Sequence, residues 1–486
     1  MTTPAETRRV ETTETEETEA QRRMVLTAHP LQRVGAFALT ALAGCREPGD
    51  VTADAFDAAV RRMADDAVRA AVLPSTTAEG AFWLKASGSF FPNSKMNHPS
   101  RASRGRQEII DQVVAWRTVP DRNRWPGRSC VLCGRDAVGY FAKVDVPLAE
   151  SENTRNSTPR GHASLALCWP CVCCFHALPY GCRLTGGQSS AVHSWDDRFL
   201  AKITTEQVDR NDQHITLGKP VSKSGGYAAE VEALERLRCY EDDVHEGIEL
   251  FVFTNYNVPS PDPLHIHGME QPLAEWLRRN LARTNDLRAM EAAYTRPKMP
   301  GRPLLARDAF HGPKRILHVL TSFVGEHSVA TLDEPHRRLI QLCFSFATEV
   351  MGMNDEDVKS IRRLARNVAT VVGSEPTASA LKKYQVAHRQ SGKLRSWLER
   401  EAVAWTLKPP TPDAGPMVST AQFRLLFDRD GQGWDYQRLL LIAVLEELDN
   451  RGWRPVDGAA VAQEIKDSDE TAFADHDENE SAGINR

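Results

Sequence analysis

The stretch Cys130-Val131-Leu132-Cys133 is matched further along the chain by Cys168-Trp169-Pro170-Cys171. Each stretch is a C-x-x-C knuckle, a spacing at which two thiolates can bind one tetrahedral metal ion from a tight turn. The 34 residues between the knuckles, 134–167, form a longer connection than a short zinc ribbon uses, but loop-closure entropy grows only logarithmically with length. We therefore predict a zinc site formed by Cys130, Cys133, Cys168 and Cys171.

Four further potential ligands follow the second knuckle, and any of them could replace one of these cysteines. They are Cys173, Cys174, His176 and Cys182. A site of four thiolates leaves no coordination position for a reacting water, so we interpret the zinc as structural. A disulfide framework is the weaker interpretation, because the glutamate-rich N-terminal segment does not resemble a secretory signal. We therefore expect a cytoplasmic protein.

The charge of this 486-residue chain is distributed unevenly. The net charge is −5, but residues 1–23 carry −2 and residues 464–486 carry −6, which leaves +3 on the body. Basic residues exceed acidic ones by eight to three in 95–128, ten to three in 278–315 and ten to two in 359–400. Three basic clusters in a chain of negative total charge favour contact with nucleic acid or a nucleoprotein. No apolar run is long enough to cross a bilayer, so no membrane contact is expected.

The hydrophobic pattern predicts an α+β fold, with a mixed N-terminal region that carries the zinc-knuckle insert and is followed by a C-terminal helical bundle. The length is that of two to four domains. The predicted organisation is a disordered acidic tail (1–23), an N-terminal α+β region (24–125), the zinc-knuckle insert (126–182), an α+β region continuing the N-terminal domain (183–300), a small-subunit-like helical bundle (301–460) and a second disordered acidic tail (461–486).

Individual elements follow from periodicity and from helix-capping residues. Helices are predicted over residues 31–43, 51–73, 107–116, 228–239, 269–282, 314–324, 378–390, 393–407 and 434–450, with further helices capped by Thr331 and Glu334 and by Asn354. Strands are predicted over 140–146, 199–203, 213–217 and 248–256. Residues 297–313 are predicted to be a linker, because they are rich in proline and glycine.

An HNH-type nuclease is the main enzymatic alternative, since that motif also lies between two C-x-x-C pairs. The corresponding strand here reads Lys143-Val144-Asp145-Val146-Pro147, with valine where the general-base histidine is expected. His162 and His176 lack the right sequence context, and without a base phosphodiester hydrolysis loses its main proton acceptor. We therefore expect no enzymatic activity. A zinc-dependent transcription regulator is a third possibility.

Several segments in order resemble the zinc-bearing large subunit of the type I-B CRISPR Cascade complex. The segments are RVGAFALTALAG at 33–44, FFPNSKMN at 90–97, the two knuckles, LFVFTN at 250–255 and the terminal helical bundle. The resemblance implies a non-catalytic subunit of an RNA-guided surveillance complex in antiviral defence. Such a subunit recognises a short flanking motif on target DNA and holds the displaced strand, while the guide RNA reads the sequence.

This resemblance also implies partners and contact residues. The partners are the other Cascade subunits with the guide RNA, the target DNA and a recruited helicase-nuclease that destroys the target. Polar and basic side chains in loops can address base edges and phosphates, and basic stripes follow the backbone. On loop position and charge, the candidates for flanking-motif contact are Asn93, Lys95, Asn97 and Arg101. The candidates for strand contact in the bundle are Lys382, Lys383, Arg389 and Lys393.

Overall fold

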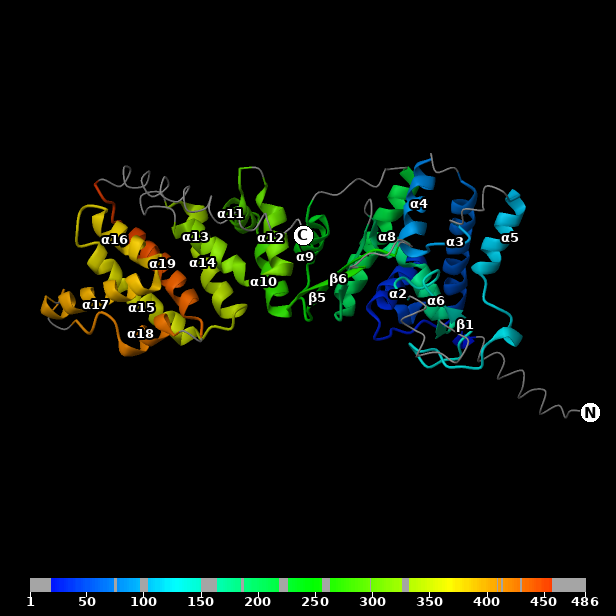
Figure 1. Ribbon diagram of the computed structural model, residues 1–486, viewed down its shortest axis with the longest axis horizontal. Helices are drawn as coiled ribbons and strands as arrows, with labels where there is room; N and C mark the ends of the chain where they lie inside the picture. The colour runs from blue at the N-terminus through cyan, green and yellow to red at the C-terminus, as the bar shows by residue number, and fades with distance from the viewer. Residues whose placement is uncertain are drawn as a thin grey trace, which may run out of the picture. The chain divides into compact units, whose positions relative to one another are not determined.

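The computed structural model describes residues 19–73, 77–96, 104–149, 164–184, 188–217, 226–255, 263–297, 299–325, 332–408, 410–411, 414–428 and 431–456. The chain divides into two compact units. Unit 1 comprises residues 1–236 and 240–271, and unit 2 comprises residues 237–239 and 272–486. Across these ranges the fold is α+β, as the sequence predicts, with helices throughout unit 2 (Figure 1). A four-cysteine cluster lies in unit 1.

Most of unit 1 is helical. Its helices are α2 (Pro30–Leu42), α3 (Ala53–Val72), α4 (Ala78–Phe90), α5 (Arg106–Trp116), α6 (Trp169–His176), α7 (Leu178–Gly181), α8 (Asp197–Leu217) and most of α9 (Ala228–Arg238), with short 3-10 turns at Pro48–Asp50 and Arg122–Arg124. The hydroxyl of Thr52 accepts from the Ala55 amide and caps α3, while the His29 ring accepts from the Gln32 amide and caps α2.

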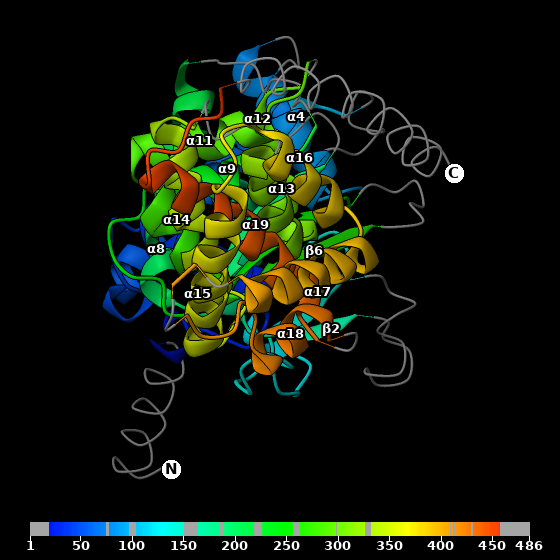
Figure 2. The same ribbon diagram turned by 90° about the vertical axis from the view of Figure 1, so that its left-hand side faces the viewer.

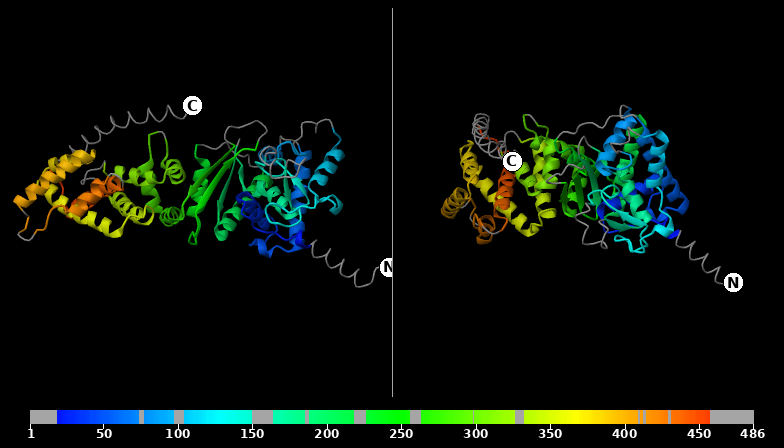
Figure 3. Two further views of the ribbon diagram at one scale, coloured as in Figure 1. Left: turned by 60° about the horizontal axis from the view of Figure 1, so that its bottom comes forward. Right: turned by 45° about the vertical axis from the view of Figure 1, so that its right-hand side comes forward.

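Two antiparallel sheets complete unit 1. The small sheet pairs β1 (Gly139–Phe141) with β2 (Leu165–Leu167), in a register that places Gly139 opposite Leu167. The larger sheet has the order β3-β4-β5-β6, formed by Arg183–Leu184, Ser189–Ser194, Ile248–Phe253 and Leu264–Met269. Its later strands, β5 and β6, appear as green arrows in Figure 3. On β5, Leu250, Phe251 and Phe253 are all buried, so both faces of this strand pack against the rest of the unit.

Helix α2 is the centre of the unit 1 core, and it packs against α6, α7 and α8. The closest approach is at Gly35. A Cβ atom at this position would lie 1.9 Å from the Cys174 carbonyl oxygen, so only glycine lets α2 lie directly on α6. The small residues that make 33–44 distinctive in the sequence therefore serve close packing of α2 against the second knuckle's helix.

Unit 2 is a helical assembly. Its helices are α10 (Gln271–Leu281), α11 (Thr284–Tyr294), α12 (Gly301–His311), α13 (Lys314–Gly325), α14 (Glu334–Glu349), α15 (Asp355–Val372), α16 (Ser379–His388), α17 (Ser391–Leu407), α18 (Thr420–Phe427) and α19 (Gly433–Asn450), with α10 beginning at the unit boundary. The pair α15 and α19 forms its centre, where Ile361, Leu364 and Leu445 are fully buried. Figure 2 shows α14, α15, α17 and α19 from the side of this unit.

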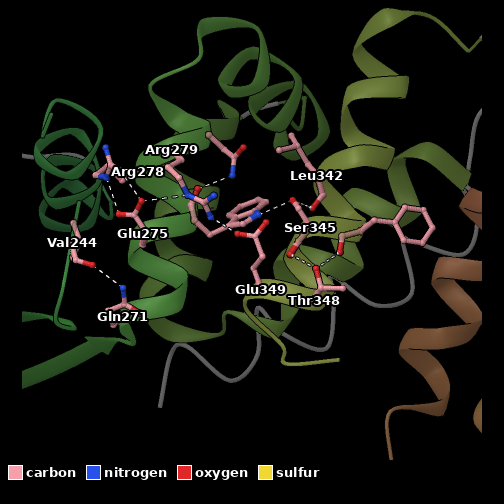
Figure 4. Close-up of polar contacts among 12 residues, drawn as sticks. Val244, Gln271, Glu275, Arg278, Arg279, Leu342, Ser345, Thr348 and Glu349 are labelled. Atoms are coloured by element: carbon pink, nitrogen blue, oxygen red, sulfur yellow. Dashed lines mark hydrogen bonds and ion pairs between the residues drawn. The ribbon is translucent and has the colours of Figure 1, made fainter. Parts of the chain in front are cut away.

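The boundary of unit 2 lies earlier than the predicted boundary between residues 300 and 301. Helix α10 belongs to unit 2 because the Trp276 indole donates to the Ser345 hydroxyl of α14 at 2.9 Å, and Arg279 pairs with Glu349 (Figure 4). Trp276 is fully buried, so separating α10 from α14 would expose a large aromatic surface. The predicted linker 297–313 contains α12, because its apolar residues Leu305, Ala306 and Phe310 are buried.

Three local predictions are wrong. Residues 199–203 and 213–217 lie within the single helix α8 rather than in strands, because α8 packs against α2, α4 and α7 and buries Phe199, Leu200 and Ile203. The predicted strand 140–146 ends at Phe141, where a turn follows. The N-cap of α14 is Asp333, which forms a capping box with His336. Thr331, which was predicted to cap it, lies outside the described residues.

The predicted N-terminal tail is also too long. Residues 19–23 contact the knuckle region, since the Arg135 guanidinium donates to the backbone carbonyls of Ala20 (2.9 Å) and Arg23. Arg22 forms an ion pair with Asp57 at 3.1 Å. Residues 1–18 and 457–486 lie outside the described residues, so for them the predicted disorder stays a prediction. Among the helices that are described, none has the length and apolar character that a membrane crossing requires.

Candidate metal centre

The four predicted cysteines come together in unit 1. The sulfur atoms of Cys130, Cys133, Cys168 and Cys171 all lie within 4.8 Å of one another, and all but the half-buried Cys133 are buried. A tetrahedral ion with Zn–S bonds of about 2.3 Å needs sulfur atoms roughly 3.8 Å apart, so the cluster has the right size for one ion. The Cys133 and Cys168 sulfurs are 3.4 Å apart.

Local backbone geometry builds the first knuckle. Gly134 has φ +79°, which only glycine adopts at low cost, and its amide donates to the Cys130 carbonyl at 2.9 Å. The Cys130 amide in turn donates to the Arg135 carbonyl at 2.6 Å. These bonds close a tight turn between the two cysteines of the first knuckle.

The second knuckle lies at the start of a helix. Cys168 is the N-cap of α6, Pro170 occupies the first turn and Cys171 follows directly. The two knuckles meet because β1 pairs with β2, and the Val131 amide donates to the Ala166 carbonyl at 3.0 Å. Gln21 adds a further link, since its side chain donates to the Asp136 carbonyl (3.1 Å) and accepts from the Trp169 amide (3.2 Å).

The thiols in this cluster compete for protons. Hydrogen bonds from the Cys168 and Cys171 thiols hold the pKa of Cys130 well below its usual range. The pKa values of Cys168 and Cys171 are raised, first because each shares its proton with Cys130 and also because both are buried. Four thiolates this close together repel one another, so their full deprotonation requires the charge of a cation. The donor set fits Zn²⁺, and tetrahedral iron uses the same ligands.

The other cysteines near the second knuckle are not part of the cluster. Within the described ranges no other group of three or more His, Cys, Asp or Glu side chains could hold a metal ion. Burial raises the pKa values of Cys173, Cys174 and Cys182, that of Cys174 to about 12. Cys174 accepts a hydrogen bond from Gln32 of α2 at 3.4 Å. These thiols therefore pack as small apolar groups in the core.

His176 is not part of the four-cysteine cluster and contacts Asp145. Its Nε2 lies 3.2 Å from Asp145 Oδ1, which also accepts from the Trp116 indole at 2.7 Å. Burial, together with the nearby Arg117 charge, lowers the pKa of His176 to about 4, so the ring is neutral at pH 7 and donates to the carboxylate. His176 is only 4% exposed, which leaves water no approach to it as a general base. Residues 143–147, which correspond to the strand that carries the general base in an HNH-type nuclease, form a turn here.

The candidate DNA-contact residues fall in both units. In unit 1, Asn93 and Lys95 are exposed in the loop after α4, and Asn93 has φ +61°. Asn97 and Arg101 lie outside the described residues. In unit 2, Lys382 and Lys383 lie on α16, Arg389 is its C-cap and Lys393 begins α17. Lys383, Arg389 and Lys393 are exposed and Lys382 is half-buried, so the turn between α16 and α17 presents a basic surface.

One element of the site was missed from the sequence. Arg117 is buried at 6% exposure, and its guanidinium lies 3.9 Å from the centre of the Trp116 ring and 4.5 Å from that of Phe91. Burial lowers its pKa to about 10. The sequence counts this residue only as one member of a basic cluster. The dipeptide Trp116-Arg117 is a weak signal, because adjacent residues on a helix do not share a face.

No family model, curated protein or solved structure matches this chain.

Proposed function

We propose that this protein is the non-catalytic large subunit of a type I CRISPR RNA-guided surveillance complex, which recognises the flanking motif on target DNA and holds the displaced strand in antiviral defence. The observation that carries the proposal is the closed four-cysteine cluster, embedded in a chain with three basic segments. Four thiolates around one ion leave no position for a reacting water, so the metal, which we propose to be Zn²⁺, braces the fold.

The two units supply two kinds of DNA contact in this proposal. The loop with Asn93 and Lys95 offers an amide that can pair with a base edge and a cation that can bind phosphate, both exposed. The α16–α17 turn offers a row of cations that can follow the phosphate backbone of the displaced strand. The other Cascade subunits, the guide RNA, a recruited helicase-nuclease and a cytoplasmic location complete the proposal.

The test is a selection on the complex purified with its guide RNA. Duplexes carry a target that matches the guide, next to a randomised flanking segment, and the bound fraction is sequenced. Enrichment of a short flanking motif, dependent on the guide, supports the proposal. Binding without any flanking preference, or binding of one fixed duplex in the absence of RNA as a transcription regulator would bind, contradicts it.

Two charge-reversal substitutions test whether the loop contributes to the duplex binding measured in the selection. Lys95→Glu should weaken duplex binding and lower the slope of log affinity against log salt by about 1, because one phosphate contact is lost. The matched control is Lys202→Glu on α8 of the same unit, where the side chain is 58% exposed and pairs with the neighbouring Glu206. Equal effects of the two substitutions would mean that Lys95 acts only through net charge.

A plasmid-cleavage assay distinguishes the proposed function from the nuclease alternative. Incubation of the purified protein with plasmid and Mg²⁺ or Mn²⁺ should leave the DNA intact. Cleavage that disappears on changing His162 or His176 would favour a zinc-stabilised HNH-type enzyme instead, with Asp145 beside His176 as the relevant pair.

A further inference from the structure

A continuous set of contacts connects the metal centre to the loop that carries Asn93 and Lys95. Helix α6 holds Cys171 near its start and His176 at its last residue, five positions or about 7.5 Å further along the axis. His176 donates to Asp145, and Asp145 also accepts from Trp116 at the end of α5. The helix that bears two of the four sulfurs is therefore fixed to α5 through one carboxylate.

Aromatic contacts extend this connection to the start of the loop. The Phe91 ring meets the Trp116 ring edge-to-face at 5.7 Å and the His176 ring at 5.9 Å. Phe91 is 1% exposed and its amide is bonded to the Ser87 carbonyl at 2.9 Å, so it continues from α4. Phe91, the first residue of the loop, is therefore held by the Trp116 and His176 rings, which both donate to Asp145.

Arg117 connects the same cluster to the other end of the loop. Its guanidinium lies over Trp116 and Phe91, and its Nη2 reaches the Met96 sulfur at 4.0 Å. Within the described residues its Nε and Nη1 have no acceptor, and the Asp145 charge opposes the burial that lowers its pKa. A buried cation with unpaired donors is costly, so the cluster depends on Asp145 staying where His176 and Trp116 hold it.

The loop between these anchors has a conformation that needs support. Asn93 has φ +61°, a sparsely populated region for a residue with a Cβ atom, and the Ser94 amide turns back to the Phe91 carbonyl at 3.1 Å. Such geometry persists only where the surroundings determine it. Here the surroundings are the buried Phe91, Ser94 and Met96, which leave Asn93 and Lys95 exposed.

We propose that His176, Asp145 and Trp116 are positioning residues that couple the metal centre to the loop 91–96, so that the knuckle sets the orientation of Asn93 and Lys95. The coupling itself follows from unit 1 alone. Its consequence for the selectivity of duplex binding rests on the proposed function.

The experiment uses a matched pair of tryptophan substitutions in the zinc-loaded full chain. Trp116→Phe keeps a ring but removes the donor to Asp145, whereas Trp125→Phe removes an equivalent indole hydrogen bond, to the Pro120 carbonyl at 2.9 Å, outside the cluster. Hydrogen exchange is measured at the Phe91 and Ser94 amides, with the buried Leu250 of β5 in the same unit as a reference for global opening of unit 1. The rate of zinc transfer to a chromogenic chelator is measured in parallel.

Trp116→Phe should raise exchange at Phe91 and Ser94 by about tenfold, which is the loss expected for one hydrogen bond to a charged group, and should also speed zinc transfer. Coupling between two sites is reciprocal, so both readouts should change together, and neither should change in Trp125→Phe. A purely structural role would raise exchange equally at Leu250 of the same unit. Unchanged loop exchange in Trp116→Phe overturns the proposal.

If Trp116→Phe fails to fold, His176→Gln is judged by the same two readouts. The preference of the complex for duplexes that carry the flanking motif is then compared between the wild type and whichever of these two variants folds. If loop exchange and zinc transfer respond but the wild type shows no flanking preference, the coupling stands and the proposed function fails. If the wild type is selective and the loop does not respond, the proposed function stands and the coupling fails.

Discussion

Substitution of Gly35 by alanine tests how α2 supports the metal centre. The added Cβ would lie 1.9 Å from the Cys174 carbonyl oxygen and 2.6 Å from its carbon, while Cβ contacts under 3.0 Å essentially never occur. One of the two backbones must therefore move by at least about 1 Å. Neither can move freely, because α2 is buried along its length and α6 carries two of the clustered cysteines.

Overpacking of this kind costs about 1–3 kcal/mol, or more where backbone opposes backbone, and the helix propensity of alanine returns up to about 1 kcal/mol. We expect a net loss of about 2 kcal/mol in the free energy of unfolding. For a unit of this size that corresponds to a decrease in melting temperature of about 4–8 °C. Zinc transfer to a chelator should also become faster, because α6 is displaced.

The assay is calorimetry of the zinc-loaded chain, with Gly392→Ala as the control. Gly392 lies in α17, where an added Cβ meets nothing within 4 Å, so that variant should be as stable as the wild type or slightly more stable. An unchanged melting temperature in Gly35→Ala would refute the packing argument. So would a loss of stability without any change in zinc transfer, since the strain would then not reach α6.

Two further predictions concern the knuckle and its neighbour. Cys130→Ser or Cys168→Ser should release the bound metal, detected by elemental analysis, and should lower solubility and melting temperature; normal values of both in each variant would argue against a structural site. His176 has a folded pKa of about 4 against an ordinary 6.5, so the unfolded state binds the extra proton. Stability should therefore fall as the pH decreases from about 6.5 towards 4, by on the order of 3 kcal/mol from this residue. Chemical denaturation across that range should show a shallower decrease in His176→Gln, and an equal slope in both proteins would contradict the assignment.

Much of the site was accessible from the sequence because its determinants are local. The knuckle spacing, the left-handed glycine at 134 and the helix start at Cys168 act over fewer than ten residues, and the structure brings the four cysteines together. Helices with a clear buried stripe were also predicted well. Asn354 caps α15, and Val358, Ile361 and Leu364 are buried as their spacing indicates.

Other features depended on packing partners that periodicity does not reveal. The residues of α8 include several β-branched side chains, which favoured strands, but the segment forms a helix in which Phe199 and Ile203 are buried. The N-terminal boundary of unit 2 likewise depends on Trp276, whose indole meets Ser345 about seventy residues away. A contact between residues so far apart in the chain cannot be predicted from the local sequence around either one.

The sequence by itself determined the α+β class, the set of four cysteines able to bind a metal ion and most helices of the bundle, because each follows from short-range spacing. Only the tertiary structure decided which sulfurs and histidines stay outside the cluster. Cys173, Cys174 and His176 follow the second knuckle closely enough in the chain to be ligands. In the fold, however, Cys174 contacts Gln32, His176 contacts Asp145 and Cys173 is buried in the core. The direction of α6 is set by how closely α2 can approach, which is a property of two helices together and of neither one alone.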